Sequence, residues 1–563
     1  MSGIDEKLKN YLIKSKVITE KQFVEIQKLA EDRKIQFTEA LVEKNIITND
    51  NLRQLLANHY GVKTVDLSKV NVPAEILSII PQDIARKQRA VVFSVEKNDI
   101  KIALFDVTNR LIRELISIKT GKQVTVYFAS KKDIDRIISQ YVVDYQKKFS
   151  RILTEGCERS LSAETCDPSI KKVIDELIYT ALQKGASDIH IEPRNNELLI
   201  RLRIDGILRN FIFIPKYLAD RIVSRIKVLC RLRTDEHLSA QDGKMRLVFD
   251  DEELGLRVSI IPIAEGEKVC MRLLSSKARS YSLEDLGLND VPLYKVKRSS
   301  ARSYGMIICT GPTGSGKTTT IYSILKTINV EEKNVTSVED PIEYRLKGAN
   351  QVQVNTKTNL TFANGLRSLL RQDPDYIFVG EIRDNETAGI AINAALTGHL
   401  VFSTLHTNSA AATIPRLFDM KVEPFLVAST LNLIIAQRLV RKICEHCKQK
   451  TTMTLQQLAD NFSPEAIKHA YHESDLKKSI EIFKGAGCGA CNNSGYSGRV
   501  AIYEVLEVDK NIRQLIAEKS NTDTIHDAAI KAGMITMVED GLIKVAKGMT
   551  TLEEILRVTK IKN

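Results

Sequence analysis

Gly-Pro-Thr-Gly-Ser-Gly-Lys-Thr occupies residues 311–318 and matches the complete pattern G-x-x-x-x-G-K-[ST] of a phosphate-binding loop. The short apolar run Met306–Thr310 precedes it and is typical of a buried strand. Apolar residues follow it at helical spacing, at Ile321, Ile324, Leu325 and Ile328. The loop is therefore predicted to join a strand to the N-terminus of a helix, where backbone N–H groups and the helix dipole favour phosphate. A chance match in a Gly-containing turn is the alternative, and both flanks disfavour it.

The loop predicts a nucleoside triphosphate site. Lys317 would reach the β- and γ-phosphate oxygens, and the hydroxyl of Thr318 would hold Mg²⁺. The predicted nucleotide-binding residues of the loop are Gly311, Pro312, Thr313, Gly314, Ser315, Gly316, Lys317, Thr318 and Thr319.

Composition narrows the class of protein but does not identify a partner. A chain of 563 residues suggests about three or four domains, and 43% apolar content is ordinary for chains with real cores. The net charge of +12 fits acidic lipid, nucleic acid or a bound nucleotide equally well. The sequence shows neither a secretion signal nor an apolar run approaching 18 residues. We therefore expect a cytoplasmic protein.

The first part of the chain contains an internal repeat. Residues 12–23 recur 29 positions later as residues 41–52, each copy reading as a helix, a break and a capped helix with Thr19 or Thr48 as N-cap. Residues 63–140 then alternate apolar strands with helical stretches, which is an α+β pattern. The predicted strands are Ala90–Val95, Ile100–Phe105 and Val124–Phe128.

Two further α/β regions follow a polar, weakly periodic stretch at 146–168 that we interpret as a linker. A helix from about Ile170 leads to Ala186–Glu192, and Leu198–Arg209 reads as a hairpin with its turn at Asp205-Gly206. Strands alternating with helices from about 300 to 440 suggest a mainly parallel sheet covered on both sides.

Carboxylates follow two apolar runs downstream of the loop. Val335–Val338 ends in Glu339-Asp340, and Tyr376–Val379 runs into Gly380-Glu381. Ends of parallel strands meet at the nucleotide crevice, so these groups could orient a metal and a water. Exposed strand-end carboxylates without such a role are the alternative. His399 and His406 bracket a further strand-like run, and the spacing alone favours packing over phosphate contact.

Nine cysteines include two C-x-x-C pairs. Cys444 and Cys447 form one, Cys488 and Cys491 the other, with 40 residues between the pairs. Four thiolates can close a tetrahedral shell around Zn²⁺ with no open position, so a structural zinc site is predicted. Buried free thiols are the alternative, which the unusually long separation leaves open.

Several ordered motifs resemble the type II secretion and type IV pilus assembly ATPases, and the resemblance extends over nearly the whole chain. The motifs are ASDIHIEP at 186–193, RIDG at 203–206, QDG at 241–243, EDPIEY at 339–344, GLRSLLRQDPD at 365–375, GEIRD at 380–384 and TGHLVFSTLHTN at 397–408, together with the four cysteines.

The resemblance implies roles that spacing could not assign. Glu339 and Asp340 match the family's Asp box, Glu381 its Walker B motif, and His399 and His406 its His box. Arginines of the smaller α/β domain approach bound nucleotide in this family. Arg257 and Arg272 match them, and Arg499 is a weaker match. The motor-domain counterparts are Arg367, Arg371 and Arg383.

The resemblance also implies an α/β multidomain fold. It has an N-terminal helical plus α+β docking module over 1–145, a linker over 146–168 and a smaller PAS-like α/β domain over 169–290. A P-loop (RecA-like) motor domain follows over 291–563, with a zinc-binding subdomain at about 441–498 and C-terminal helices. In some relatives the N-terminal module binds cyclic di-GMP. Here Gln36, Thr38 and His59 depart from that pattern in the second copy, as do Lys7, Lys9 and Ala30 in the first, so we hypothesise a docking role with weak or no cyclic di-GMP binding.

The resemblance implies a Mg²⁺-dependent ATPase that acts as a homohexamer at the inner face of the cytoplasmic membrane. It would power pilin or pseudopilin assembly through a membrane platform protein, with Lys317, Glu381, Glu339, Arg257 and Arg272 carrying the chemistry and Zn²⁺ a structural role. The docking module could also bind a membrane-anchored partner. Two alternatives are a nucleic-acid-translocating ring ATPase, which lacks a recognisable nucleic-acid module here, and a non-hydrolysing ATP-sensing scaffold, which the intact carboxylate and arginine set disfavours.

Overall fold

The computed structural model describes residues 170–559 except 250–251, 275–280, 329–330, 474 and 476, and also residues 145–155. Of residues 61–138 it describes all except 68–69, 71, 78, 81–83, 86–87, 97, 106 and 108–109. Before residue 61 it describes 18–20, 22–23, 26–27, 41 and 47. The chain divides into two compact units, one formed mainly by residues 1–143 and the other mainly by residues 144–563.

The first unit is built on a four-stranded sheet in the order β1-β4-β3-β2. The predicted strands are confirmed: they are β2 (Ala90–Val95), β3 (Asp99–Leu104) and β4 (Gln123–Phe128), with β1 (Lys63–Thr64) at the edge. The helices that accompany them are α5 (Ala74–Leu77), α7 (Arg110–Thr120) and α8 (Lys131–Ile138). Thr19 caps a helix as predicted, because its hydroxyl accepts the N–H of Gln22. The other positions of the repeat on which we based a prediction, Thr48 among them, lie outside the described residues.

Residues 145–155 correct the predicted linker. They form α9 (Tyr145–Glu155), and Phe149 on this helix is buried against Phe211 of the following domain. The reason is an apolar stripe that the polar composition obscured: Phe149, Ile152 and Leu153 recur at helical spacing and join one hydrophobic cluster. The first half of the predicted linker is therefore a packed helix.

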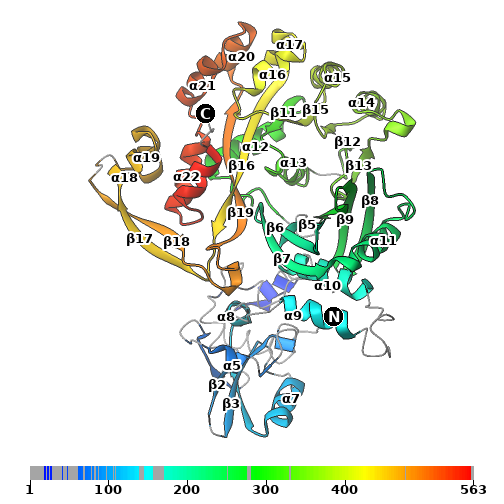
Figure 1. The fold of residues 1–563 in the computed structure, drawn as a ribbon. Helices are drawn as coiled ribbons and strands as arrows, with labels where there is room; N and C mark the ends of the chain where they lie inside the picture. Colours follow the sequence, from blue (N-terminus) through cyan, green and yellow to red (C-terminus); the bar gives the residue numbers. More distant parts are fainter. Residues whose placement is uncertain are drawn as a thin grey trace. The chain divides into compact units, whose positions relative to one another are not determined.

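The second unit begins with a six-stranded antiparallel sheet in the order β7-β6-β5-β10-β9-β8 (Figure 1). The predicted hairpin is confirmed, and Asp205 and Gly206 both have positive φ at its turn. This conformation is the one that a two-residue hairpin turn requires. The elements are α10 (Ile170–Gln183), β5 (Ala186–Pro193), β6 (Glu197–Ile204), β7 (Ile207–Pro215), α11 (Ala219–Cys230), β8 (Gln241–Phe249), β9 (Glu252–Ile263) and β10 (Gly266–Leu274).

Alternation along these strands gives the sheet two different faces. One face is apolar and packs with α10 and α11 into a single hydrophobic cluster. The intervening positions on the strands are polar, and Arg257 of β9 lies opposite Arg272 of β10 in the register. The sheet thus presents a pair of guanidinium groups on the face away from its core.

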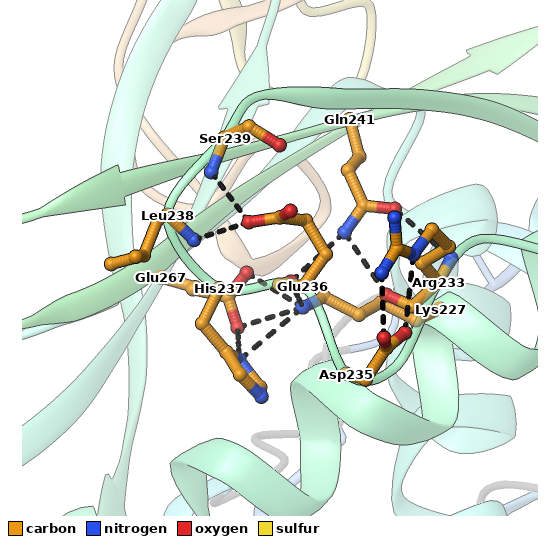
Figure 2. A network of polar contacts seen from close by, with 9 residues as sticks. All are labelled: Lys227, Arg233, Asp235, Glu236, His237, Leu238, Ser239, Gln241 and Glu267. Atoms are coloured by element: carbon orange, nitrogen blue, oxygen red, sulfur yellow. Dashed lines mark hydrogen bonds and ion pairs between the residues drawn. The ribbon is translucent and has the colours of Figure 1, made fainter.

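The loop between α11 and β8 is held by a buried lysine (Figure 2). Lys227 is fully buried, and its Nζ lies 2.8 Å from the carboxylate of Glu267 on β10 and 2.6 Å from the carbonyl oxygen of Glu236. Nδ1 of His237 lies 2.7 Å from the same carboxylate, and the Gln241 amide also donates to the Glu236 carbonyl. These contacts fix the start of β8 against the rest of the sheet.

The second domain of this unit contains a seven-stranded sheet in the order β13-β12-β14-β15-β11-β16-β19. All neighbouring strands are parallel except β16 and β19, which confirms the mainly parallel sheet predicted from the sequence. The strands are β11 (Gly305–Thr310), β12 (Val335–Glu339), β13 (Ala349–Gln353), β14 (Tyr376–Val379), β15 (Leu400–Leu405), β16 (Leu431–Ile443) and β19 (Tyr496–Glu507).

Helices cover both faces of this sheet. Ile307 and Cys309 of β11 face a cluster with α12 (Asp290–Ser300) and α13 (Lys317–Leu325), whereas Met306 and Ile308 face the larger cluster on the other side. That side carries α14 (Phe362–Leu369), α15 (Asn385–Leu396), α16 (Thr413–Asp419), α17 (Pro424–Thr430), α20 (Lys510–Ala517), α21 (Thr522–Lys531), α22 (Met537–Ala546) and α23 (Leu552–Thr559).

A small insert separates β16 from β19. It consists of the antiparallel pair β17 (Lys448–Thr454) and β18 (Ser479–Gly485), joined by α18 (Leu455–Ala459) and α19 (Pro464–Tyr471) (Figure 1). The insert accounts for the long separation of the two C-x-x-C pairs, because it lies between them. None of the helices described here has the length and apolar character needed to cross a membrane.

Candidate functional site

The phosphate-binding loop lies where the sequence predicts it, between β11 and α13. Gly311, Gly314 and Gly316 all have positive φ, and Gly316 is the N-cap of α13. A Cβ at Gly311 would come within 2.4 Å of the Gln437 carbonyl oxygen, so a side chain at that position would clash with backbone. The glycines therefore serve both the curvature of the loop and its close packing.

Lys317 turns back onto the loop that carries it. Its Nζ donates to the carbonyl oxygens of Gly311 at 2.8 Å and Pro312 at 3.2 Å, and its side chain is largely buried. Burial lowers the pKa of Lys317 from its ordinary value. Pro312, Thr313 and Gly314 are exposed at the tip. The ammonium group thus lies inside the curve where an anion would bind.

Gln437 on β16 anchors the loop, and the sequence analysis did not identify it. Its amide nitrogen donates to the carbonyl of Ser315 at 2.6 Å. Its amide oxygen accepts from the hydroxyl of Thr320 at 2.8 Å and the thiol of Cys309 at 3.1 Å. Gln437 is buried, so these bonds are made without competition from water. One side chain therefore ties together β11, the loop and α13.

Glu381 is the carboxylate that faces the loop. It follows β14, and its oxygens lie 2.5 Å from Arg383 and 3.6 Å from Nε2 of His406, which follows β15. Its negative charge also acts on Lys317. Burial and the nearby Lys317 cation lower the pKa of His406, which favours the neutral imidazole. The structure thus gathers four predicted site residues from three neighbouring strand ends.

Glu339 has different surroundings. The carboxylate is buried at 2% exposure and accepts hydrogen bonds from Tyr322, Ser337 and Gln351. Burial raises the pKa of Glu339, although these hydrogen bonds act in the opposite direction. In this arrangement Glu339 links α13 to β12 and β13. The next residue, Asp340, is exposed and lies close enough to Arg383 to act on its charge.

The two predicted histidines lie at opposite ends of β15. A strand of six residues spans about 20 Å, so His399 is remote from the cluster around His406. Nδ1 of His399 lies 2.9 Å from the carbonyl oxygen of Ala394 on α15. His406 is therefore the one of the pair that the structure brings to the phosphate-binding loop.

The arginines also fall into separate groups. Arg257 and Arg272 line a cleft of about 610 Å³ between the six-stranded sheet and the segment that follows β12. Arg367 pairs with Glu386 of α15 at 2.6 Å, and Arg371, just after α14, donates to the Arg367 carbonyl and the Ser368 hydroxyl of that helix. Arg383 alone among the predicted arginines contacts Glu381 in the described part of the chain.

The four cysteines predicted to bind metal lie together. Each offers a sulfur, and all four sulfur atoms are within 4.8 Å of one another. Sγ of Cys488 and Sγ of Cys491 are 3.7 Å apart. Zn–S bonds of about 2.3 Å place sulfur atoms about 3.8 Å apart at the corners of a tetrahedron. The cluster therefore has the donor set and spacing of a closed metal site.

The family is shown by a match over most of the chain. The family model of the type II/IV secretion system protein matches residues 163–557, and the model of the MshEN domain matches residues 60–147. The chain belongs to the type II/IV secretion system protein family. It is an ATPase of this family.

Curated relatives of the family cover most or nearly all of the chain. It is 36% identical to the type IV pilus assembly ATPase PilB of Myxococcus xanthus, with 99% of each chain covered. It is 42% identical to the type II secretion system ATPase E of Vibrio cholerae, over 78% of this chain and 85% of that one. Among solved structures, the ATPase DotB of Yersinia pseudotuberculosis shares the fold, with 20% identity, a TM-score of 0.50 and coverage of 69% of this chain and 93% of that one.

Proposed function

We propose that this type II/IV secretion ATPase is a Mg²⁺-dependent motor that acts as a homohexamer at the inner face of the cytoplasmic membrane. It would power assembly of a type IV pilus or a secretion pseudopilus through a membrane platform protein. The observation that carries the proposal is the convergence of Lys317, Glu381, Arg383 and His406 beside the phosphate-binding loop. Hydrolysis of a phosphoanhydride requires positive charge on the phosphates and an oriented water, and this group has the side chains that could supply both.

Each residue would have a distinct part in hydrolysis. Lys317 would hold the transferring phosphate, and Glu381 would orient the attacking water. Mg²⁺, when held by Thr318, would neutralise phosphate charge. Neutral His406 could accept a hydrogen bond near the γ-phosphate without adding a further cation. Glu339 would support the site by fixing α13 against the sheet, because its buried carboxylate accepts three hydrogen bonds.

Movement would come from a change in the angle between the domains built on the two sheets of the second unit. We infer a smaller PAS-like domain around the six-stranded sheet and a RecA-like motor domain around the seven-stranded sheet, with boundaries at 169–290 and 291–563. Arg257 and Arg272 belong to the first sheet, so their contact with phosphate would depend on the angle between the domains. ATP and ADP can favour different angles only through such a difference in affinity.

We also propose roles for the four-cysteine cluster and for residues 1–145. The four-cysteine cluster would hold a structural Zn²⁺, which would tie the end of β16 to the start of β19. Residues 1–145 would dock to a membrane-anchored partner, and the prediction of weak or absent cyclic di-GMP binding is retained. No nucleic-acid partner is proposed.

The test combines turnover with a cellular readout. The purified chain should release phosphate from Mg·ATP in a hexameric fraction identified by light scattering. A deletion strain should lose pili or secretion and regain them with the wild-type gene but not with Lys317→Ala. Stimulation of turnover by DNA that is strongly salt-dependent would favour the nucleic-acid translocase instead.

A further inference from the structure

The cleft between the two sheets is strongly cationic. Its volume is about 610 Å³, and five of its lining residues carry a positive charge: Lys244, Arg246, Arg257, Arg272 and Arg345. Among the described residues that line it, Glu343 is the one carboxylate. A cluster of like charges at close range is unfavourable without an anion, so Glu343 is the counter-charge that lines the cleft itself.

The arginine pair has two acidic neighbours of different kinds. Arg257 and Arg272 are directly opposed in the β9–β10 register, so their charges repel. Nε of Arg272 donates to Oδ1 of Asp188 at 2.9 Å, and Asp188 lies on β5 of the same sheet. Glu343 instead follows β12 of the motor sheet. A rotation between the sheets would therefore keep the Asp188 contact and change the separation from Glu343.

The environment of Glu343 couples its charge to the arginines. Burial raises the pKa of the Glu343 carboxyl, while Arg272, Arg257 and Lys244 act to lower it. If the arginines moved away, this half-buried carboxylate would lose the favourable effect of their charge. Separation therefore costs free energy on both sides of the cleft.

We propose that Glu343 is a positioning residue whose charge attracts Arg257 and Arg272 across the cleft when no triphosphate is bound and competes with the γ-phosphate for them. The inference rests on the proposed function, since it concerns the same arginines. A triphosphate carries more charge than a carboxylate and can displace Glu343. A diphosphate that does not reach the arginines leaves their attraction to Glu343 unopposed. The residue would thus sharpen the discrimination between ATP and ADP on which domain movement depends.

The test is nucleotide binding by Glu343→Gln in the full-length chain. Equilibrium affinities for ADP and for a non-hydrolysable ATP analogue, both with Mg²⁺, are measured for wild type, the variant and the matched control Glu465→Gln on the exposed face of α19. Removing the competing charge should raise affinity for the ATP analogue about three- to tenfold and leave ADP affinity within about twofold. The control should match wild type for both ligands.

A second pair of variants tests whether Glu343 acts through Arg272. In an Arg272→Ala background, Glu343→Gln should produce less than half of the gain, in logarithmic units, seen in the wild-type background, because the two residues act together. Equal effects on both nucleotides, no effect, or weaker binding of the ATP analogue would overturn the inference. Failure of the wild-type protein to bind either nucleotide would instead refute the proposed function, so the two failures are distinguishable.

Discussion

Nε2 of His406 lies 3.6 Å from Oε2 of Glu381, which joins the ends of two neighbouring parallel strands beside the phosphate-binding loop. Glu381 is partly buried, and its negative charge acts on Lys317. Glu339 differs from Glu381, because its carboxylate accepts hydrogen bonds within a buried network.

Glu381→Gln should therefore trap nucleotide. Loss of the charge that orients water should lower kcat by about 100-fold or more, while affinity for ATP changes only a few-fold. Phosphate release and nucleotide binding measure the two quantities. Glu465→Gln, an exposed substitution with the same charge change, is the control. Comparable losses of binding and turnover would indicate a structural role instead.

Gln437→Leu should loosen the phosphate-binding loop. The substitution keeps the volume but leaves the Ser315 carbonyl and the Thr320 hydroxyl without their buried partner. We expect a loss of about 1–3 kcal/mol in unfolding free energy and an increase in KM for ATP. Urea unfolding and steady-state kinetics measure these changes. Gln514→Leu, at an exposed position of α20, should change neither the unfolding free energy nor the KM. An unaltered KM in Gln437→Leu would argue against the anchoring role.

The four-cysteine cluster should bind one zinc ion per chain. Metal analysis of the purified protein should find it, and Cys488→Ser should lose it along with thermal stability, because the ligand set supplies part of the folding free energy. Cys270→Ser, outside the cluster, should retain the metal. A zinc-free protein of full stability would contradict the assignment.

Acid should weaken the packing of the C-terminal helix α23. Burial would raise the pKa of Glu554, but hydrogen bonds from Arg557 and Arg441 outweigh it and lower the pKa to about 2. Since the folded pKa is below the unfolded one, the stabilisation is complete above about pH 4.5 and is lost as pH falls toward 2. At neutral pH, Glu554→Gln should cost about 2–3 kcal/mol.

The measurement is urea unfolding across this range. The difference in unfolding free energy between wild type and Glu554→Gln should shrink as pH falls below 4.5. Glu553→Gln, on the same helix but exposed toward Lys484, should show a smaller cost at neutral pH. A difference independent of pH would show that the ion pairs are not its source.

Local sequence was sufficient for much of this fold and of its site. The strand, glycine turn and helix around Lys317 are set by residues adjacent in the chain, and period-two alternation located the hairpin at Asp205-Gly206. The predicted carboxylate positions at strand ends were confirmed because parallel strands place their carboxyl ends at one edge.

The features that the sequence could not predict depend on contacts between distant segments of the chain. Gln437 reaches the loop from β16, and no local pattern marks an anchoring amide there. Glu339 ends β12 and Glu381 follows β14, yet their surroundings differ. Tyr322 and Gln351 hydrogen-bond to the buried Glu339, whereas Glu381 contacts Arg383 and His406 beside the loop. Helix α9 was hidden by polar residues around its apolar stripe, and only packing against Phe211 identifies its buried side.

We propose that the loop at 311–318 binds the triphosphate whose hydrolysis drives the motor. This proposal is tested most directly by phosphate release from Mg·ATP in the purified hexameric fraction, comparing wild type with Lys317→Ala. We expect turnover by wild type and a loss of at least about 100-fold in the variant, with unchanged circular dichroism. Full ATPase activity in Lys317→Ala would contradict the assignment of this loop as the triphosphate site.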